Sequence, residues 1–247
     1  MQFILQLEKI KVRLLPLVLT PLLICGAGLA QSDLPRFGIG VDMSTLGAGI
    51  EAATAVTRKS NARVGFNDFS YSRDLHKDGI NYSGELQLRS FEILYDQYLV
   101  GGLHISPGLL AYNGNRANAT AAVPGGQTFS LGGVTYMSAA SNPVTGTGTV
   151  NLGTTAPEVL LGFGNLLPRS GRHFTVNFEF GAVFQQSPKA TLNLNGTVCD
   201  QTGVVCAPVS SYPGLQANIQ NEQTKINNDL NFFRYYPVIR FGIGYKF

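Results

Sequence analysis

The amino-acid sequence predicts an all-β fold: a closed antiparallel transmembrane β-barrel of eight strands, with one short amphipathic helix before the last strand. Charged residues make up 13% of the chain, against roughly 25% in a typical soluble domain. Glycine is frequent, with 29 residues. Segments in which apolar residues alternate with small or polar ones recur along the chain, and period two is the mark of a strand with two different faces.

The first thirty residues predict an export signal peptide. Basic residues between positions 9 and 13 precede an apolar stretch, Leu14–Ile24, that is too short to span a bilayer as a helix. Gly28-Leu29-Ala30 then offers small residues for cleavage before Gln31. A retained anchor helix is the alternative. We therefore expect residues 1–30 to be removed and residues 31–247 to form one outer-membrane barrel domain.

Charge gives no sign of a nucleic-acid partner. Without residues 1–30 the chain holds 15 basic and 14 acidic residues, so the sequence pI of about 8.8 mostly reflects the signal peptide. No basic patch is interleaved with aromatic residues. Residues 31–247 also contain no uninterrupted apolar run of the length that a membrane-spanning helix needs.

The alternation is clearest from Phe174 to Phe184 and again from Ile239 to Phe247. In both segments one face is large and apolar, while the other is glycine, polar or charged. A lipid-facing apolar band around a polar interior is what a membrane barrel needs, and the sheet must close because backbone groups in hydrocarbon have to be paired. A soluble β-sandwich is the alternative, but glycines mixed with charges of both signs suit a narrow interior better than an open surface.

Eight segments follow the pattern. The predicted strands span 37–44, 48–57, 62–72, 80–96, 101–113, 156–166, 173–186 and 235–247. The phase of alternation slips near Asn67-Asp68 and near Arg89-Ser90, and we interpret both slips as β-bulges. Two other counts stay open: 37–57 could be one strand, or Thr128–Tyr136 could add a hairpin about Gly132-Gly133, making ten.

The two longest connections, 113–155 and 187–234, are expected to be extracellular loops. Within the second, apolar residues at helical spacing follow Pro213-Gly214 and predict an amphipathic helix near 215–231 that packs on the barrel. Cys199 and Cys206 lie in the same connection. In an oxidising compartment such a pair predicts a disulfide, and no nearby histidine completes a metal site.

The interior faces of the predicted strands carry charges of both signs. The predicted interior charge network comprises Asp42, Glu51, Arg63, Glu85, Arg89, Glu158, Glu179 and Arg240. Eight strands leave an interior just wide enough for side chains, where charges have to pair. We expect a salt-bridged plug; a narrow conduit gated by rearranging these pairs is the alternative.

The carboxyl-terminal segment Tyr236–Phe247 resembles the terminal strand of bacterial outer-membrane barrels, which ends in an aromatic residue. The resemblance implies that the barrel-assembly machinery reads Phe247, Tyr245 and Ile243. Val64-Gly65-Phe66-Asn67 and the barrel size resemble the small barrels of the outer membrane protein A and W kind. The chain departs from the former in having no peptidoglycan-binding domain after the barrel. The implied location is the outer membrane of a Gram-negative envelope.

One arrangement, His104-Ile105-Ser106, places an imidazole and a hydroxyl on the same strand face. It resembles the His-x-Ser motif of outer-membrane barrels that deacylate lipid A, with a glutamate to orient the imidazole. The predicted topology puts His104 just after a periplasmic turn, far from the outer leaflet. We therefore expect no enzyme, and no catalytic, cofactor-binding or metal-binding residue.

These observations favour an integral outer-membrane protein with a filled interior and an envelope-structural or surface-contact role, exerted through the loops at 113–155 and 187–234. The expected partners are outer-membrane lipid, the barrel-assembly machinery and an extracellular ligand that the sequence does not identify. A narrow channel for small or apolar solutes is the second hypothesis. A lipid A-modifying hydrolase using His104 and Ser106 is the third.

Overall fold

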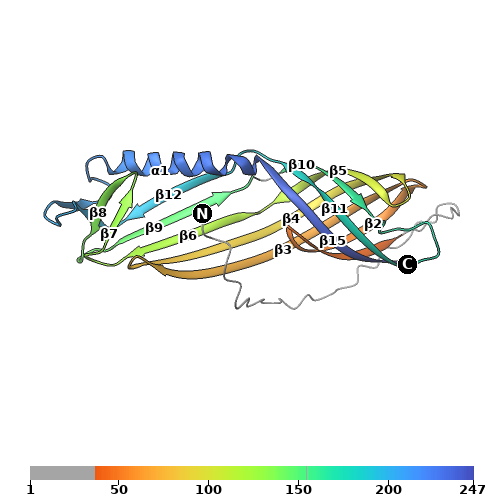
Figure 1. Cartoon of the computed structure of the whole chain (residues 1–247), viewed down its shortest axis with the longest axis horizontal. Helices are drawn as coiled ribbons and strands as arrows, with labels where there is room; N and C mark the ends of the chain where they lie inside the picture. The colour runs from red at the N-terminus through yellow and green to blue at the C-terminus, as the bar shows by residue number, and fades with distance from the viewer. Residues whose placement is uncertain (1–36, 154) are drawn as a thin grey trace. The chain divides into compact units, whose positions relative to one another are not determined.

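A computed structural model describes residues 37–153 and 155–247, so the predicted signal peptide lies outside the described residues. Eight antiparallel strands form a closed ring (Figure 1). In ring order they are β1 (Gly38–Ser44), β2 (Gly47–Thr57), β3 (Ser60–Lys77), β4 (Ile80–Val100), β5 (Leu103–Asn113), β10 (Ala156–Phe163), β11 (Phe174–Phe184) and β15 (Tyr235–Lys246). The first and last strands close the ring, from Gly38 opposite Lys246 to Ser44 opposite Arg240. The predicted eight-stranded barrel is confirmed, and 37–57 is two strands.

The outward face of the ring is apolar and exposed, because period two sends every second side chain away from the interior. On β15 and β11, for example, Phe241 and Phe178 are opposite each other and both are about half exposed. The exposed apolar residues of the ring include Ile39, Val41, Ile50, Val64, Phe66, Phe91, Ile93, Ile105, Leu109, Val159, Leu161, Val176, Phe178, Phe180, Ile239, Phe241 and Ile243. A contiguous apolar surface of this extent needs an apolar environment.

Strands β3 and β4 are longer than the ring requires, and they continue beyond it. Strand β4 pairs with β5 from Ser90 onward, but its first part, Asn81–Gln87, pairs with β6 (Arg116–Val123). Strands β9 (Val144–Asn151) and β12 (Lys189–Asn195) extend this open sheet. We call β3, β4, β6, β9 and β12 beyond the ring the sheet extension; it occupies the opposite end of Figure 1 from the C-terminus.

A smaller sheet lies beside the sheet extension. Its strands are β7 (Thr128–Leu131), β8 (Val134–Ser138), β13 (Thr197–Cys199) and β14 (Cys206–Pro208). The hairpin about Gly132-Gly133 therefore forms, with both glycines at positive φ. It belongs to this second sheet and not to the ring, so the ten-stranded alternative is wrong.

The helix predicted near 215–231 is confirmed as α1 (Leu215–Leu230), followed by a 3₁₀ turn, η1 (Asn231–Arg234). It packs along β12 of the sheet extension and not on the barrel wall (Figure 1). Its buried residues Leu215 and Ile219 join an apolar core with Val144, Val198 and Tyr136. Among the described residues, no helix is long and apolar enough to cross a membrane.

The bulge predicted near Asn67-Asp68 is wrong. The bulge predicted near Arg89-Ser90 is displaced: the register of β4 with β5 shifts between Phe91 and Glu92, whose partners are Tyr112 and Leu110. Strands β3 and β4 pair without interruption from Ser60 opposite Gln97 to Lys77 opposite Ile80. The alternation slips near Asp68 because β3 leaves the ring there, and near Arg89 because β4 exchanges β5 for β6 as its neighbour. Beyond those points the strands no longer separate a barrel interior from its exterior, so their residue types need not alternate.

Candidate functional site

Charged side chains inside the ring form one network centred on two arginines. Arg63 on β3 donates hydrogen bonds to Glu51 (2.8 Å), to Asp96 (2.9 Å) and to both carboxylate oxygens of Glu179. Each of these groups is nearly inaccessible to solvent. Planar guanidinium groups suit this role, because five donors in a fixed plane can satisfy several carboxylates at once.

Arg240 on β15 repeats the arrangement. Its Nη2 donates to Glu92 at 2.5 Å and its Nη1 to Glu179 at 3.2 Å, while Nε lies 3.3 Å from Asp42 Oδ1. Glu179 on β11 therefore accepts from both arginines and joins the two halves of the network.

These ion pairs run across the lumen, not along its wall. In the order of the ring, β3 lies opposite β11 and β4 lies opposite β15. The pairs Arg63–Glu179 and Arg240–Glu92 thus span two full diameters of the barrel. The side chains of both pairs are almost inaccessible to solvent, so they fill the lumen at this level.

Buried apolar side chains fill the lumen beside the network. On its side toward the sheet extension, Leu94, Leu110, Leu160, Val183 and Val238 form a cluster with at most 2% of any residue exposed. This cluster interleaves with the charged residues, since Leu94 lies between Glu92 and Asp96 on β4. At the other end, Leu166 and Leu167 pack on Ala53. Arg169 holds that end segment in place by donating to the carbonyls of Thr57 and Leu167, at 2.7 and 2.8 Å.

His104 and Ser106 lie inside this filled interior, only 2% and 0% exposed. They do not bond to each other: the Ser106 hydroxyl donates to Asp96 at 2.7 Å, and His104 lies between the Gly102 carbonyl and Glu179, each at 3.0 Å. Both ring nitrogens face acceptors, so neither is free to take a proton from Ser106. The geometry required of a nucleophile and its base is not met.

Asp96, His104 and Glu179 also bring their ligand atoms within 4.8 Å of one another, a spacing that a metal ion could bridge. Arg63 already donates to both carboxylates. The positive charge that a metal would supply is therefore provided by the guanidinium, and this triad belongs to the salt-bridge network.

Carboxylates outnumber cations among the described interior residues. Asp42, Glu51, Glu92, Asp96, Glu158 and Glu179 face Arg63, Arg240 and His104. Glu158 on β10 is 1% exposed, and neither of its carboxyl oxygens has a hydrogen-bond partner among the described residues. An ionised group in this position costs several kcal/mol, on the order of a buried unpaired charge.

Six of the eight residues predicted for the interior network lie in the interior, but Glu85 and Arg89 do not. Glu85 is exposed on the sheet extension, and Arg89 pairs on the outer surface with Asp68 at 2.6 Å. Sequence reasoning omitted Glu92 and Asp96 of the network. Their even spacing with Leu94, between the outward-facing Phe91, Ile93 and Tyr95, was the signal that could have found them.

The terminal strand residues lie at the seam of the ring. Tyr245 pairs with Ile39 and Ile243 with Val41 across the junction of β15 with β1. The Phe247 backbone N–H donates to the Phe37 carbonyl at 3.2 Å, and the two rings stack at 5.9 Å. Tyr245 joins the same aromatic cluster.

The predicted Cys199–Cys206 disulfide is present and joins β13 to β14. The enclosed loop is ordered by Asp200, whose carboxylate accepts from the Thr202 hydroxyl at 2.7 Å and from the backbone N–H groups of Val204 and Val205. These bonds, that from Thr202 first, lower the pKa of Asp200 below its ordinary value.

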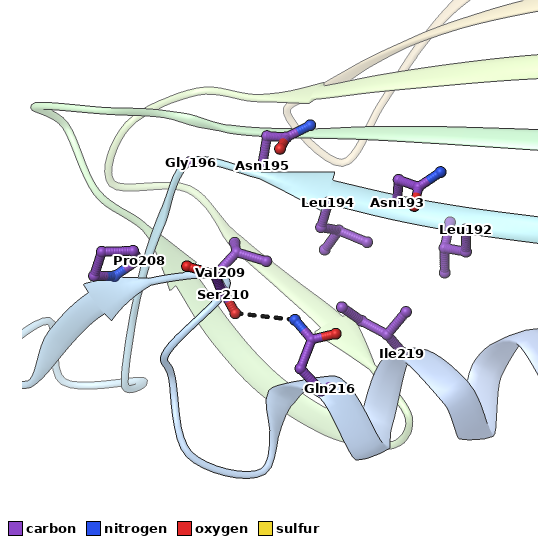
Figure 2. A pocket seen from close by; sticks show the side chains of 10 residues that line it. All are labelled: Leu192, Asn193, Leu194, Asn195, Gly196, Pro208, Val209, Ser210, Gln216 and Ile219. Atoms are coloured by element: carbon purple, nitrogen blue, oxygen red, sulfur yellow. Dashed lines mark hydrogen bonds between the residues drawn. The ribbon is translucent and has the colours of Figure 1, made fainter.

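A cavity of about 270 Å³ lies between the end of β12 and the start of α1. Figure 2 shows the side chains that line it. Leu192, Leu194 and Ile219 contribute apolar side chains, and Gln216 closes one side by donating to the Val209 carbonyl at 3.2 Å. This size suits a few water molecules or one small group more than a metabolite.

No protein-family model and no curated protein sequence matches the chain. Solved structures that resemble it include two from Acinetobacter baumannii. Acinetobacter baumannii CarO is 19% identical, with a TM-score of 0.54 and coverage of 85% of this chain and 97% of its own. Acinetobacter baumannii CarO2 is 21% identical, with a TM-score of 0.55 and coverage of 87% and 99%. At these identities the likeness shows the fold of the chain and no finer relationship.

Proposed function

We propose that this chain is an integral outer-membrane protein whose closed barrel anchors a folded extracellular platform, made of the sheet extension, the smaller sheet and α1. The observation that carries this proposal is the filled interior, in which two arginine–carboxylate pairs cross the full width of the ring and buried apolar side chains pack beside them. The exposed apolar band supports membrane embedding. The likeness to two barrels of Acinetobacter baumannii is consistent with the same setting.

The work of such a protein is surface contact or envelope structure, exerted outside the barrel. The residues beyond the ring form their own apolar core, which includes Ile80, Val123 and Leu215. Long extracellular connections that fold around a core present a fixed surface, and binding functions commonly lie on such surfaces. We assign the barrel no catalytic role and no cofactor.

Planar-bilayer recording tests the closed barrel. The refolded full chain is expected to give no discrete conductance steps, under conditions where a general diffusion porin gives them. Uniform steps from the wild type would refute the closed anchor and favour the narrow channel. If Arg63→Ala or Arg240→Ala then changed those steps, the charge network would be the gate of that channel.

Membrane embedding has a separate test in the mobility of the chain on gels. A folded barrel resists SDS, so the unheated protein from outer-membrane fractions should migrate faster than the boiled one. Deleting Phe247 should lower the amount of shifted protein, because this residue closes the β1–β15 seam and is proposed to be read by the assembly machinery. An unshifted band in the soluble periplasmic fraction would refute the proposal.

A further inference from the structure

A row of five polar side chains, two of them basic and two of them amides, crosses the outer face of the sheet extension just above the ring. The register places Ser70, Gln87, Arg116, Asn151 and Lys189 side by side on β3, β4, β6, β9 and β12. They share the outward face with Phe66 and Phe91, because positions an even number of residues apart on a strand point the same way. We call these five residues the basic row.

The basic row lies close to the lipid-facing band. On β4, Gln87 is four residues from Phe91, which is opposite Tyr112 of β5. At 3.3 Å per residue this is about 13 Å along the strand, and Arg89 lies about half that distance away. Long basic side chains at this height can reach the headgroup layer that borders the hydrocarbon.

A pocket of about 480 Å³ opens between these two levels, where β4 parts from β5 and joins β6. Its lining holds Arg89, Arg116, the Tyr112 ring and four primary amides, and it contains no carboxylate. The amides are those of Gln87, Asn113, Asn115 and Asn151. Arg116 and Lys189 have no partner among the described residues, and Arg89 is bonded through Nε to Asp68.

The pocket is preformed by its own hydrogen bonds. Asn115 accepts from the Arg89 backbone N–H at 2.7 Å, Asn113 accepts from the Asn115 N–H at 3.1 Å, and the Gly114 N–H donates to the Arg89 carbonyl at 2.8 Å. A rigid wall lowers the entropy lost when a ligand binds.

From this placement we infer that the pocket and the basic row bind the phosphorylated sugar headgroup of an outer-leaflet glycolipid, with its acyl chains against Phe91 and Tyr112. Guanidinium groups match phosphate oxygens with paired hydrogen bonds, and primary amides suit sugar hydroxyls. Asp68, Asp74 and Glu85 are the acidic groups on the same face of β3 and β4; Asp68 is neutralised by Arg89, Glu85 lies in the next row outward and Asp74 lies beyond it. The inference rests on the proposed membrane embedding, since a glycolipid meets this face only there.

The experiment uses the full refolded chain in phospholipid nanodiscs, with native mass spectrometry to count retained lipid. The probes are diphosphorylated lipid A, the same lipid after removal of both phosphates, and inorganic phosphate. We expect the phosphorylated lipid to bind about tenfold more tightly than the dephosphorylated one, the order expected for two charge-assisted contacts. R116Q/K189Q should abolish this preference, while R73Q/K225Q, an equal loss of charge at exposed positions outside the row, should keep it.

Equal binding of the two lipids, or an unchanged preference in R116Q/K189Q, would overturn the inference. Inorganic phosphate binding as tightly as the lipid would also overturn it, because the ligand would then be a soluble anion. The gel mobility of each sample distinguishes failure of the glycolipid inference from failure of the proposed membrane embedding. A heat-dependent shift without phosphate preference refutes only this inference, whereas the absence of the shift refutes the proposed membrane embedding itself.

Discussion

At the scale of single residues, an arginine inside the ring contributes much more to stability than an arginine on its outer surface. Arg240 is completely buried and contacts three carboxylates. The Arg89 side chain is 47% exposed, and its guanidinium pairs with one carboxylate, that of Asp68. A buried ion pair that loses one partner leaves an uncompensated charge, whereas an exposed pair exchanges its partner for water.

Arg240→Met should therefore lower the free energy of unfolding by about 3–5 kcal/mol, because Asp42, Glu92 and Glu179 lose a buried cation. Arg89→Met removes an equal charge at the surface and should cost less than about 1 kcal/mol. Urea titration in detergent measures both losses of unfolding free energy. Far-UV circular dichroism monitors the unfolding, because the chain contains no tryptophan. Equal losses in the two variants would contradict the assignment of a structural role to the interior network.

Glu158 lies in the interior, as the sequence predicts, but among the described residues it does not form the ion pair that the sequence leads us to expect. The alternation of β10 is enough to predict that Glu158 faces the interior. The same alternation does not predict which cation would pair with its carboxylate. The structure gives its carboxyl no partner. Glu158→Gln should accordingly leave the unfolding free energy unchanged or raise it, measured as above, since the amide carries no charge to bury. A loss as large as that of Arg240→Met would show that Glu158 has a partner.

At the scale of strands, the interior fits because glycines face the charged side chains. A Cβ added at Gly49 would lie 2.5 Å from both Asp42 Oδ2 and Asn67 Oδ1, and one added at Gly65 would lie 2.5 Å from Glu92 Oε1. The abundance of glycine on the polar faces is thus a packing requirement of a narrow barrel, in which large and small residues must alternate.

Gly49→Ala should destabilise the barrel by about 1–3 kcal/mol, the cost of overpacking a filled interior. Gly146→Ala is the matched control. It also lies within a strand, but its added Cβ would find nothing nearer than 3.9 Å, so no loss is expected. The midpoint temperature of the gel-mobility shift reports the difference, and a similar midpoint for both variants would argue against tight packing around Asp42.

The ring could be predicted from the sequence because a membrane imposes one rule on every strand: outward residues are apolar and inward ones are not. The sheet extension could not, because its faces obey no such rule. Strand β9, Val144–Asn151, is a run of Thr and Gly that reads as loop by composition. Its pairing with β6 and β12 depends on long-range register, which local pattern does not contain. Glu85 and Arg89 were misplaced for the same reason, since they lie past the ring on β4.

At the scale of the whole molecule, the barrel and the platform share β3 and β4 but have separate apolar cores. Regions with separate cores can open independently. Replacing both cysteines, C199S/C206S, should lower the stability of the platform by about 2 kcal/mol, the order for a short cross-linked loop. The barrel should keep its full gel-mobility shift. Hydrogen exchange should locate the loss in β13 and β14, and faster exchange in β11 or β15 would show that the two cores unfold together.

The pairing of β1 with β15 also bears on how the molecule is made. Met43 meets Phe241 across nearly two hundred residues of intervening chain, so the contacts that close the ring are among the most distant in the sequence. Loop-closure entropy has to be overcome before such contacts are rewarded, which makes them slow. Strands β2 to β5 can pair early as hairpins, while their outward apolar faces are still exposed to water. Until β15 pairs with β1, the chain is therefore an open sheet with two unpaired edges and an exposed apolar face. Avoiding aggregation depends on keeping such intermediates apart from other unfolded chains.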